Sequence, residues 1–544
     1  MSSRDGLSAI AFTDGPAADQ IVVCASDGRG LAWSAPVRVD GGAANVLRYT
    51  QADSVHVLGS RVYVGWSDER WGNREVYFNR SNDGGVTWAG EQRINTTLPA
   101  GFGTVRHWRM EVSPDPMGGQ DHVYFLLCVT EPAGGADMEG LFLVHSNTAG
   151  AAFLAPTHAP AGFMPAGQHV ENIDLAVQGG FNVNVLWQDD RGAPLWTVWY
   201  QVSFTGGATW LNVDRNMNSG APGWAAGNVS LDVELQGVLA AWEDQRTGGA
   251  GGPTELQYAF SVDDGINWSP DFLVGGYMPG VDDVDGLDVA LNGGHAIVAW
   301  RDNRLGAYEN FVASGLLGAL NPEAQLSFGG AQAPRLDGHM EGTGDDFAVA
   351  WRDTMVPSRI QSAFTRDGGQ SWDPAFIVSD AALASSQPVL DYNASYNNFV
   401  HAWVANDAGV AHAFAGGYRP AQVQALGVFQ AGQFVNFAVT GFPSSQAGWN
   451  YLVLLSAASG AVLLPDGRST GLGLDPILMH VLAARPNFGG VLPASGNATT
   501  PVLVFPPAAV ILPGTVLNFA AVAVNAPAGP AFGALTDLGS VVVQ

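Results

Sequence analysis

Residues 61–88 form a unit whose pattern recurs along most of this chain. The unit, RVYVGWSDERWGNREVYFNRSNDGGVTW, contains two segments with the two-residue alternation of β-strands. Each copy is marked by an aromatic residue, usually followed by Asp, at intervals of about 50 to 60 residues. These landmarks are Phe12, Trp66, Phe125, Trp187, Trp242, Trp300, Trp351 and Trp403. Repetition on this scale predicts similar units packed side by side.

The landmark spacing suits one four-stranded sheet with its loops, and radial repetition of such sheets gives a β-propeller. The 70 Gly, 31 Pro and few helical patterns also favour an all-β fold. We therefore predict a β-propeller of eight blades over residues 1–418. Seven blades are the alternative if the first and last fragments share a blade, because the first lacks a visible inner strand and the last lacks the glycine-rich turn.

The glycine-rich turn that ends the unit has the pattern SxDxGxTW. In such a turn Asp can accept backbone N–H groups, Gly can take a positive φ, and Trp can cover the hairpin. We therefore interpret it as a structural element. The best copies contain Ser81, Asp83, Gly85, Thr87 and Trp88; Ser261, Asp263, Gly265 and Trp268; and Thr365, Asp367, Gly369 and Trp372.

This turn resembles the Asp-box of sialidase-like (BNR) repeat proteins. The resemblance implies a propeller scaffold and, for a sialidase, an arginine triad, a Tyr paired with Glu as nucleophile, an Asp acid/base and an Arg-x-Pro motif near the start. This chain has no Arg-x-Pro near its N-terminus. The resemblance therefore covers the scaffold, and we assign no catalytic residue from it.

Polar residues that break the repeat are the candidates for a ligand site. They occur in the segments RHWRME, QHVENID and RLDGHME, where inner strands are expected. A sugar could stack on Trp108, and its carboxylate could meet Arg109; alternatively, these groups fill the centre of the propeller with satisfied contacts. The candidates are Arg106, His107, Trp108, Arg109, Glu111, His169, Glu171, Arg335, His339 and Glu341.

An acid precedes the landmark in most units. Because an active site needs asymmetry, repeated acids are expected to anchor backbone groups between blades or to pair with Arg. These acids are Asp53, Glu111, Asp174, Asp232, Asp288, Asp337 and Asp391.

One acidic loop, VDDVDG, offers Asp282, Asp283 and Asp285 as oxygen ligands for Ca²⁺. The loop lacks the spacing of an EF-hand, so a solvated acidic turn is the alternative. We expect no other cofactor. Cys24 and Cys128 lie in separate apolar segments and are expected to be buried free thiols.

The composition changes after residue 418. Residues 419–544 carry three Arg and three Asp, so the whole net charge of −27 belongs to the preceding residues. Apolar runs alternate there with Pro, Gly and Asn turns, which predicts a β-sandwich loosely like those of secreted bacterial surface proteins. A surface this poor in charge could serve self-assembly or anchoring through strand edges, or it could simply be neutral.

Charge and targeting signals limit the partners. A net charge of −27 makes nucleic acid an unlikely partner, and no stretch is long and apolar enough for a membrane helix. Residues 1–12 have no signal-peptide core. Because Asp-box proteins are usually secreted, we expect an extracellular or cell-surface protein whose upstream sequence has been processed or omitted.

These observations favour a non-enzymatic extracellular surface protein. In this interpretation the propeller binds a partner or is a structural unit, and residues 419–544 mediate self-assembly or anchoring. The alternatives are a sialidase-like exo-glycosidase and a carbohydrate-binding lectin without hydrolysis.

Overall fold

The computed structural model is almost entirely β. It forms two compact units. One comprises Met1–Gln361 and Val378–Gly417, and the other comprises Ser362–Ile377 and Tyr418–Gln544. The described residues are all except 15–19, 28–29, 31, 43–47, 51–53, 98–102, 132–137, 160–167, 193–194, 219–224, 236, 250, 331–334, 338–346, 366–367, 381, 394–397, 408–409, 419–421, 428, 431–432, 443–445, 447, 459–461, 463, 465–469, 471, 484–487, 494–496, 505–512, 526–530, 536–538 and 544.

Eight antiparallel sheets precede residue 419, as the eight-blade prediction requires. The first four consist of β1 (Ser2–Arg4), β2 (Leu7–Asp14), β3 (Gln20–Ser26) and β4 (Val37–Arg38); β5 (Arg48–Tyr49), β6 (Val55–Leu58), β7 (Arg61–Asp68), β8 (Glu75–Ser81) and β9 (Gln92–Arg93); β10 (Thr104–Ser113), β11 (His122–Glu131), β12 (Met138–Ser146) and β13 (Thr157–His158); and β14 (Val170–Gln178), β15 (Asn182–Gly192), β16 (Leu195–Ser203) and β17 (Arg215–Asn216). A short 3₁₀ helix, η1 (Asn95–Thr97), follows β9.

The next four sheets repeat this order. They consist of β18 (Ala225–Glu234), β19 (Gly237–Asp244), β20 (Glu255–Ser261) and β21 (Phe272–Leu273); β22 (Val284–Asn292), β23 (His295–Asp302), β24 (Glu309–Leu316), β25 (Ala319–Leu320) and β26 (Ala324–Gln325); β27 (Arg335–Asp337), β28 (Phe347–Arg352), β29 (Ile360–Thr365) and β30 (Phe376–Ile377); and β31 (Ala384–Asn393), β32 (Asn398–Asp407) and β33 (Val410–Tyr418).

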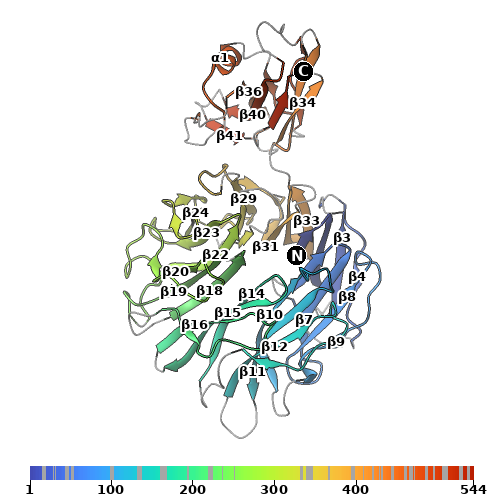
Figure 1. Cartoon of the computed structure of the whole chain (residues 1–544), viewed down its shortest axis with the longest axis vertical. Helices are drawn as coiled ribbons and strands as arrows, with labels where there is room; N and C mark the ends of the chain where they lie inside the picture. Colours follow the sequence, from blue (N-terminus) through green and yellow to red (C-terminus); the bar gives the residue numbers. More distant parts are fainter. Residues whose placement is uncertain are drawn as a thin grey trace. The chain divides into compact units, whose positions relative to one another are not determined.

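One edge strand of each sheet belongs to what we call the inner ring, which consists of β1, β6, β10, β14, β18, β22, β27 and β31. Nearly all of them contact their neighbours in sequence, and β31 contacts β1. In Figure 1, β10, β14 and β22 lie toward the centre of the sheets, and β9 and β16 lie outside them. This radial arrangement confirms the propeller fold.

The first and eighth sheets close the ring. The backbone N–H of Ser3 donates to Asp391 Oδ2 at 2.6 Å, and Asn393 Nδ2 donates to Ser3 Oγ at 3.1 Å. The inner strand that the sequence did not reveal in the first unit is thus β1, which is only three residues long and polar. The first and last fragments therefore belong to two sheets, and the seven-blade alternative is wrong.

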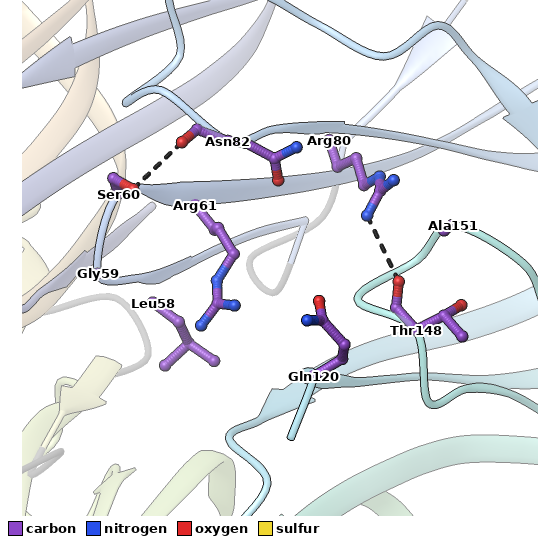
Figure 2. A pocket seen from close by; sticks show the side chains of 9 residues that line it. All are labelled: Leu58, Gly59, Ser60, Arg61, Arg80, Asn82, Gln120, Thr148 and Ala151. Carbon is purple, nitrogen blue, oxygen red and sulfur yellow. Dashed lines mark hydrogen bonds between the residues drawn. The ribbon is translucent and has the colours of Figure 1, made fainter. Parts of the chain in front are cut away.

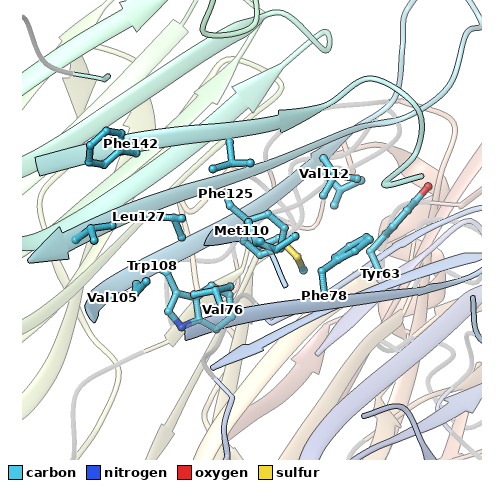
Figure 3. Close-up of a cluster of buried hydrophobic side chains, with 14 of the residues drawn as sticks. Tyr63, Val76, Phe78, Val105, Trp108, Met110, Val112, Phe125, Leu127 and Phe142 are labelled. Atoms are coloured by element: carbon cyan, nitrogen blue, oxygen red, sulfur yellow. The ribbon is translucent and has the colours of Figure 1, made fainter. Parts of the chain in front are cut away.

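The hydrophobic core lies between neighbouring sheets. Side chains of β8, β10, β11 and β12 interlock in one such layer, shown in Figure 3. Trp108 belongs to this layer and is 1% exposed, so the expectation that it stacks on a sugar is wrong. Because side chains alternate between the two faces of a strand, Trp108 and Met110 of β10 point into this layer, where they pack with Phe78 and Phe125.

The glycine-rich turns have the expected local geometry. Asp83 accepts the backbone N–H of Thr87 at 2.8 Å, Gly85 has φ +87°, and Trp88 Nε1 donates to Gly85 O at 3.1 Å. Hydrogen bonds from Thr87 and Ser81 lower the pKa of Asp83 to about 2. The turn at Ser261 repeats these contacts, while Asp367 of the third turn lies outside the described residues.

The C-terminal residues form two sheets around one core, as predicted for a sandwich. One sheet contains β34 (Gln422–Gly427), β35 (Phe434–Thr440), β38 (Ala498–Thr499) and β39 (Leu503–Val504), and the other contains β36 (Asn450–Ser456), β37 (Gly489–Val491), β40 (Val516–Asn525), β41 (Ala531–Leu535) and β42 (Gly539–Val542). Phe437 and Phe519 meet between them, with ring centroids 5.1 Å apart. The assembly or anchoring role expected for residues 419–544 stays a prediction.

A helix that the sequence did not reveal, α1 (Pro476–Ala483), packs on β36. Pro476 occupies its first turn, and Asp475 caps it by accepting the N–H of Leu478 at 2.8 Å. Leu478 enters a second apolar cluster with Leu454 and Val522. Val481 of the same helix belongs to the sandwich core, so the helix contacts both apolar clusters.

Within the described residues, no helix has both the length and the apolar character to cross a membrane.

Candidate functional site

The inner ring is irregular near the N-terminal ends of its strands. The pairing register shifts in β10, β14, β18, β22 and β31. Such bulges insert residues and redirect their side chains, and they are common beside active sites. Arg106, Asn172 and Asp285 are among the inserted residues, and Asn172 has a positive φ of 47°. The bulges thus concentrate polar groups at one end of the inner ring, which we call the bulge edge.

The strand order decides what else lies at the bulge edge. In an antiparallel sheet, the second-to-third turn lies at the same end as the start of the first strand. The start of β12 therefore comes beside the start of β10, and Thr130 of β11 pairs with both Thr104 and Glu139. The Ser81 turn, between the third and fourth strands, lies at the opposite end.

A charged cluster spans the third and fourth sheets at the bulge edge. The Arg106 guanidinium binds Glu139 and also Glu171, with Nη2 3.0 Å from Glu171 Oε1. His169 Nδ1 is 3.3 Å from Glu139 Oε1, and the backbone N–H of Val170 donates to Glu139 Oε2 at 2.6 Å. The Glu139 side chain is 1% exposed and that of Glu171 is 44% exposed. Arg106 thus bridges a buried carboxylate, Glu139, and a partly exposed one, Glu171.

Burial opposes the charge of Arg106, but the hydrogen bond to Glu139 and the nearby negative charges together outweigh it and raise the pKa of Arg106. Burial and the nearby Arg106 lower the pKa of His107, which therefore favours its neutral form. Arg109 lies 3.5 Å from Asp174, within the same inner strands. Arg106, His107, His169 and Glu171 therefore come together. Trp108 turns into the core, and Glu111 lies farther along β10, opposite Tyr124.

The repeated acids link neighbouring inner strands, as expected. Asp174 Oδ2 accepts the N–H of Leu231 at 2.8 Å, and Asp232 Oδ2 accepts that of Leu291 at 2.7 Å. Asp391 makes the equivalent bond to Ser3, and Asp288 Oδ1 accepts Ser230 Oγ at 3.2 Å. Burial raises the pKa of Asp232 to about 7. Asp53 and the side chain of Asp337 lie outside the described part of the chain.

A second cluster joins the fifth and sixth sheets at the bulge edge. Buried Glu243 accepts Gly286 N at 2.7 Å and Asn228 Nδ2 at 2.8 Å. Burial raises the pKa of Glu243, and Asp285 adds to this effect. Asp285 is 46% exposed and forms an ion pair with Arg301. Two neighbouring carboxyl groups thus occupy contrasting surroundings.

Sequence reasoning missed Glu139 and Glu243. Glu139 is preceded by a segment whose length differs between the repeats, and Glu243 occupies the position after the Trp242 landmark, which other copies fill with Thr, Ser, Leu, Gln, Arg or Val. An acid beside a landmark in one copy alone was the available signal for Glu243. Among the third group of candidates, Arg335 lies in β27 without a described side chain, and His339 and Glu341 lie outside the described residues.

The three acids proposed as calcium ligands bind separate partners. Asp282 accepts the N–H of Met278, Asp283 accepts Thr254 and Tyr308, and Asp285 pairs with Arg301. Among the described residues, no group of three or more His, Cys, Asp or Glu side chains could hold a metal ion. Calcium binding stays untested. Cys24 and Cys128 are both buried and free, as predicted.

The radial sheets define this chain as a β-propeller protein. No protein-family model matches the chain, and no curated protein matches its sequence. Several solved structures show some similarity to the chain. One is the GH93 α-L-arabinofuranosidase of Fusarium graminearum in complex with arabinobiose, which is 12% identical over 56% of this chain and 89% of that chain, with a TM-score of 0.36.

Two further solved structures match. The catalytic domain of the Coprinopsis cinerea GH62 α-L-arabinofuranosidase is 10% identical, covers 46% of this chain and 89% of its own, and has a TM-score of 0.26. A post-proline cleaving enzyme from Rickettsia typhi is 9% identical over 72% of this chain and 58% of its own, with a TM-score of 0.38.

These matches change two expectations. The expectation of a non-enzymatic surface protein is contradicted: several of the matched structures are named as α-L-arabinofuranosidases. The propeller scaffold that the resemblance implied is confirmed by the order of the sheets. The matched structures do not support a sialidase assignment.

Proposed function

We propose that this protein is a glycoside hydrolase whose site is the bulge edge between the fifth and sixth sheets. Glu243 is the general acid and Asp285 is the general base. The observation that carries this proposal is the contrast between two carboxyl groups. Glu243 is buried and has no cation partner in the part of the chain that the structure describes, whereas Asp285 is half-exposed and paired with Arg301. Pairs of carboxyl groups with opposed surroundings divide acid and base roles in enzymes.

Hydrolysis of a glycosidic bond requires one carboxyl group that carries a proton and one that does not. Glu243 donates its proton to the glycosidic oxygen as the bond to the anomeric carbon breaks. Asp285 accepts a proton from the water that attacks the anomeric carbon. Because burial raises the pKa of Glu243, the proton needed for the first step is retained closer to neutral pH.

The experiment is a turnover assay on a broad panel of chromogenic and fluorogenic glycosides, including an α-L-arabinofuranoside and a sialoside. We expect the wild-type protein to hydrolyse at least one of them and Glu243→Gln to lose this activity. Glu234→Gln is the matched control, since Glu234 ends the same sheet's inner strand at the other edge. A panel without turnover would count against hydrolysis.

A second candidate function is sugar binding without hydrolysis. The Arg106 cluster supports it, because Arg106 pairs with both Glu139 and Glu171, while Arg106, His169 and Glu171 keep partly exposed donors and acceptors. A glycan array distinguishes the two functions: glycans that bind without being cleaved support the second. In that case Glu171→Gln weakens binding, whereas Glu243→Gln leaves it unchanged.

A further inference from the structure

A pocket lies at the opposite edge of the propeller from the bulge edge, between the second and third sheets. It has a volume of about 770 Å³ and is lined by turns next to β6, β8, β10 and β12. Figure 2 shows Arg61, Arg80 and Gln120 around the same space. Ser60, Asn82 and Thr148 add neutral polar groups. The lining contains two arginines and no acid, in a chain with a net charge of −27.

The two arginines differ in their partners. Arg61 binds Asp121 through Nε and Nη2, both at 2.8 Å, and the Asp121 side chain is 2% exposed behind it. Asp121 also accepts the hydroxyl of Tyr63. The charge of Arg61 is therefore neutralised by a buried carboxylate, and Arg61 is part of the fold.

Arg80 has no carboxylate partner among the described residues. Its Nη1 donates to two carbonyls of the next sheet, Ala149 O at 2.8 Å and Thr148 O at 3.4 Å. Its Nε is buried without a hydrogen-bond partner in the same described part of the chain. The two carbonyls fix the guanidinium, so an incoming anion meets a cation that is already positioned.

We propose that this pocket binds a sugar that carries a carboxylate, such as a uronic acid. A guanidinium matches the geometry of a carboxylate, and the Asn82 and Gln120 amides suit sugar hydroxyls. The volume lies in the range of about 300–1,000 Å³ that small-molecule sites occupy, which exceeds what a bare anion needs. Asp5, which accepts the N–H of Gly59 at the rim, disfavours ligands with several charges.

The test is isothermal titration calorimetry of the full chain with glucuronate, glucose, acetate and sulfate at low salt. We expect glucuronate to bind at least about tenfold more tightly than the other three. Arg80→Gln should weaken glucuronate binding about tenfold or more. Arg74→Gln is the matched control, because Arg74 directly precedes β8, which Arg80 nearly ends, and should leave binding unchanged.

Equal binding of glucose would remove the role of the carboxylate. Equal binding of acetate or sulfate would reduce the pocket to a simple anion site, and no binding of glucuronate would also overturn the proposal. If Arg80→Gln does not fold, Gln120→Ala tests the same pocket from the next sheet and should weaken glucuronate binding. The inference is independent of the proposed hydrolysis, since the two sites lie at opposite edges and have separate variants.

Discussion

The two clusters at the bulge edge use the same scaffold in different ways. Glu139 and Glu243 are both buried, and each accepts a backbone N–H from the next inner strand, at 2.6 and 2.7 Å. Arg106 is an inserted bulge residue and lies between its two carboxylates. Arg301 comes from a second strand and binds the open carboxylate, Asp285.

The position of one arginine therefore separates a binding cluster from a reactive one. A cation beside a buried carboxyl group favours its charged form, whereas burial alone favours the protonated form. Glu139 has Arg106 beside it, and Glu243 has neutral donors from Asn228 and Gly286. Four predictions test this difference, from the largest expected effect to the smallest.

The largest effect is expected on catalysis. Asp285→Asn should lower kcat about 10²- to 10⁴-fold on the substrate found in the glycoside panel, because the base is lost. Glu171→Gln should leave kcat within about threefold and raise KM, since Glu171 belongs to the binding cluster. Steady-state kinetics of both variants measure this. Equal losses of kcat would erase the distinction between the clusters.

Stability should separate the two buried glutamates. Glu139→Gln removes the charge that Arg106 and His169 face, and we expect a loss of about 2–3 kcal/mol in the free energy of unfolding. Glu243→Gln keeps a neutral group of the same shape and should cost less than about 1.5 kcal/mol. Denaturant unfolding of both variants at pH 6 gives the comparison. A larger loss for Glu243→Gln would mean that Glu243 is charged in the folded protein.

The pH dependence of stability should come from Asp232 and Glu243, which have no ion pair with a cation among the described residues. Burial raises the pKa of Asp232 to about 7 and also raises the pKa of Glu243. The folded state then binds more protons than the unfolded state between about pH 4 and 7. Stability from these groups is present below pH 4 and is lost as the pH rises to 7.

Asp232→Asn should therefore flatten the fall in unfolding free energy between pH 4 and 7, measured by urea titration at several pH values. Asp174→Asn serves as the comparison, because Asp174 makes the same link between strands and lies near Arg109. A pH profile unchanged by Asp232→Asn would contradict the proposed cause.

The smallest effect is expected for Arg301→Gln. Arg301 pairs with a half-exposed carboxylate, and such pairs contribute about 0–1 kcal/mol to the free energy of unfolding. Thermal unfolding tests this prediction, and a large loss of stability would show that Arg301 is structural.

The sequence predicted the parts of the fold that repeat. The Trp66 and Trp300 landmarks are fully buried, the Ser81 turn has the expected bonds, and Asp174 links two inner strands. The reason is that periodic burial and tight turns are encoded locally. The β1 strand was missed because three polar residues carry no alternation, and their pairing depends on Leu7–Asp14 and β31.

The candidate site was predicted in part. Arg106, His169 and Glu171 do meet. Glu139, which contacts Arg106 and His169, was missed because the length of the preceding segment differs between the repeats. Trp108 was misplaced because its pattern does not reveal which face of a bulged strand points inward. Bulges change the side on which residues lie without changing composition, so the chemistry at the bulge edge had to be read from the structure.

The bond between Ser3 and Asp391 joins residues 388 positions apart. A ribosome adds about 5–20 residues per second, so the first strand waits roughly 20–80 s for its partner to be made. During that interval the side of the first sheet that later meets β31 has no neighbour from its own chain. The order of synthesis therefore leaves this surface open to other nascent chains. The eighth sheet has to pack against β1 before a strand of another chain does.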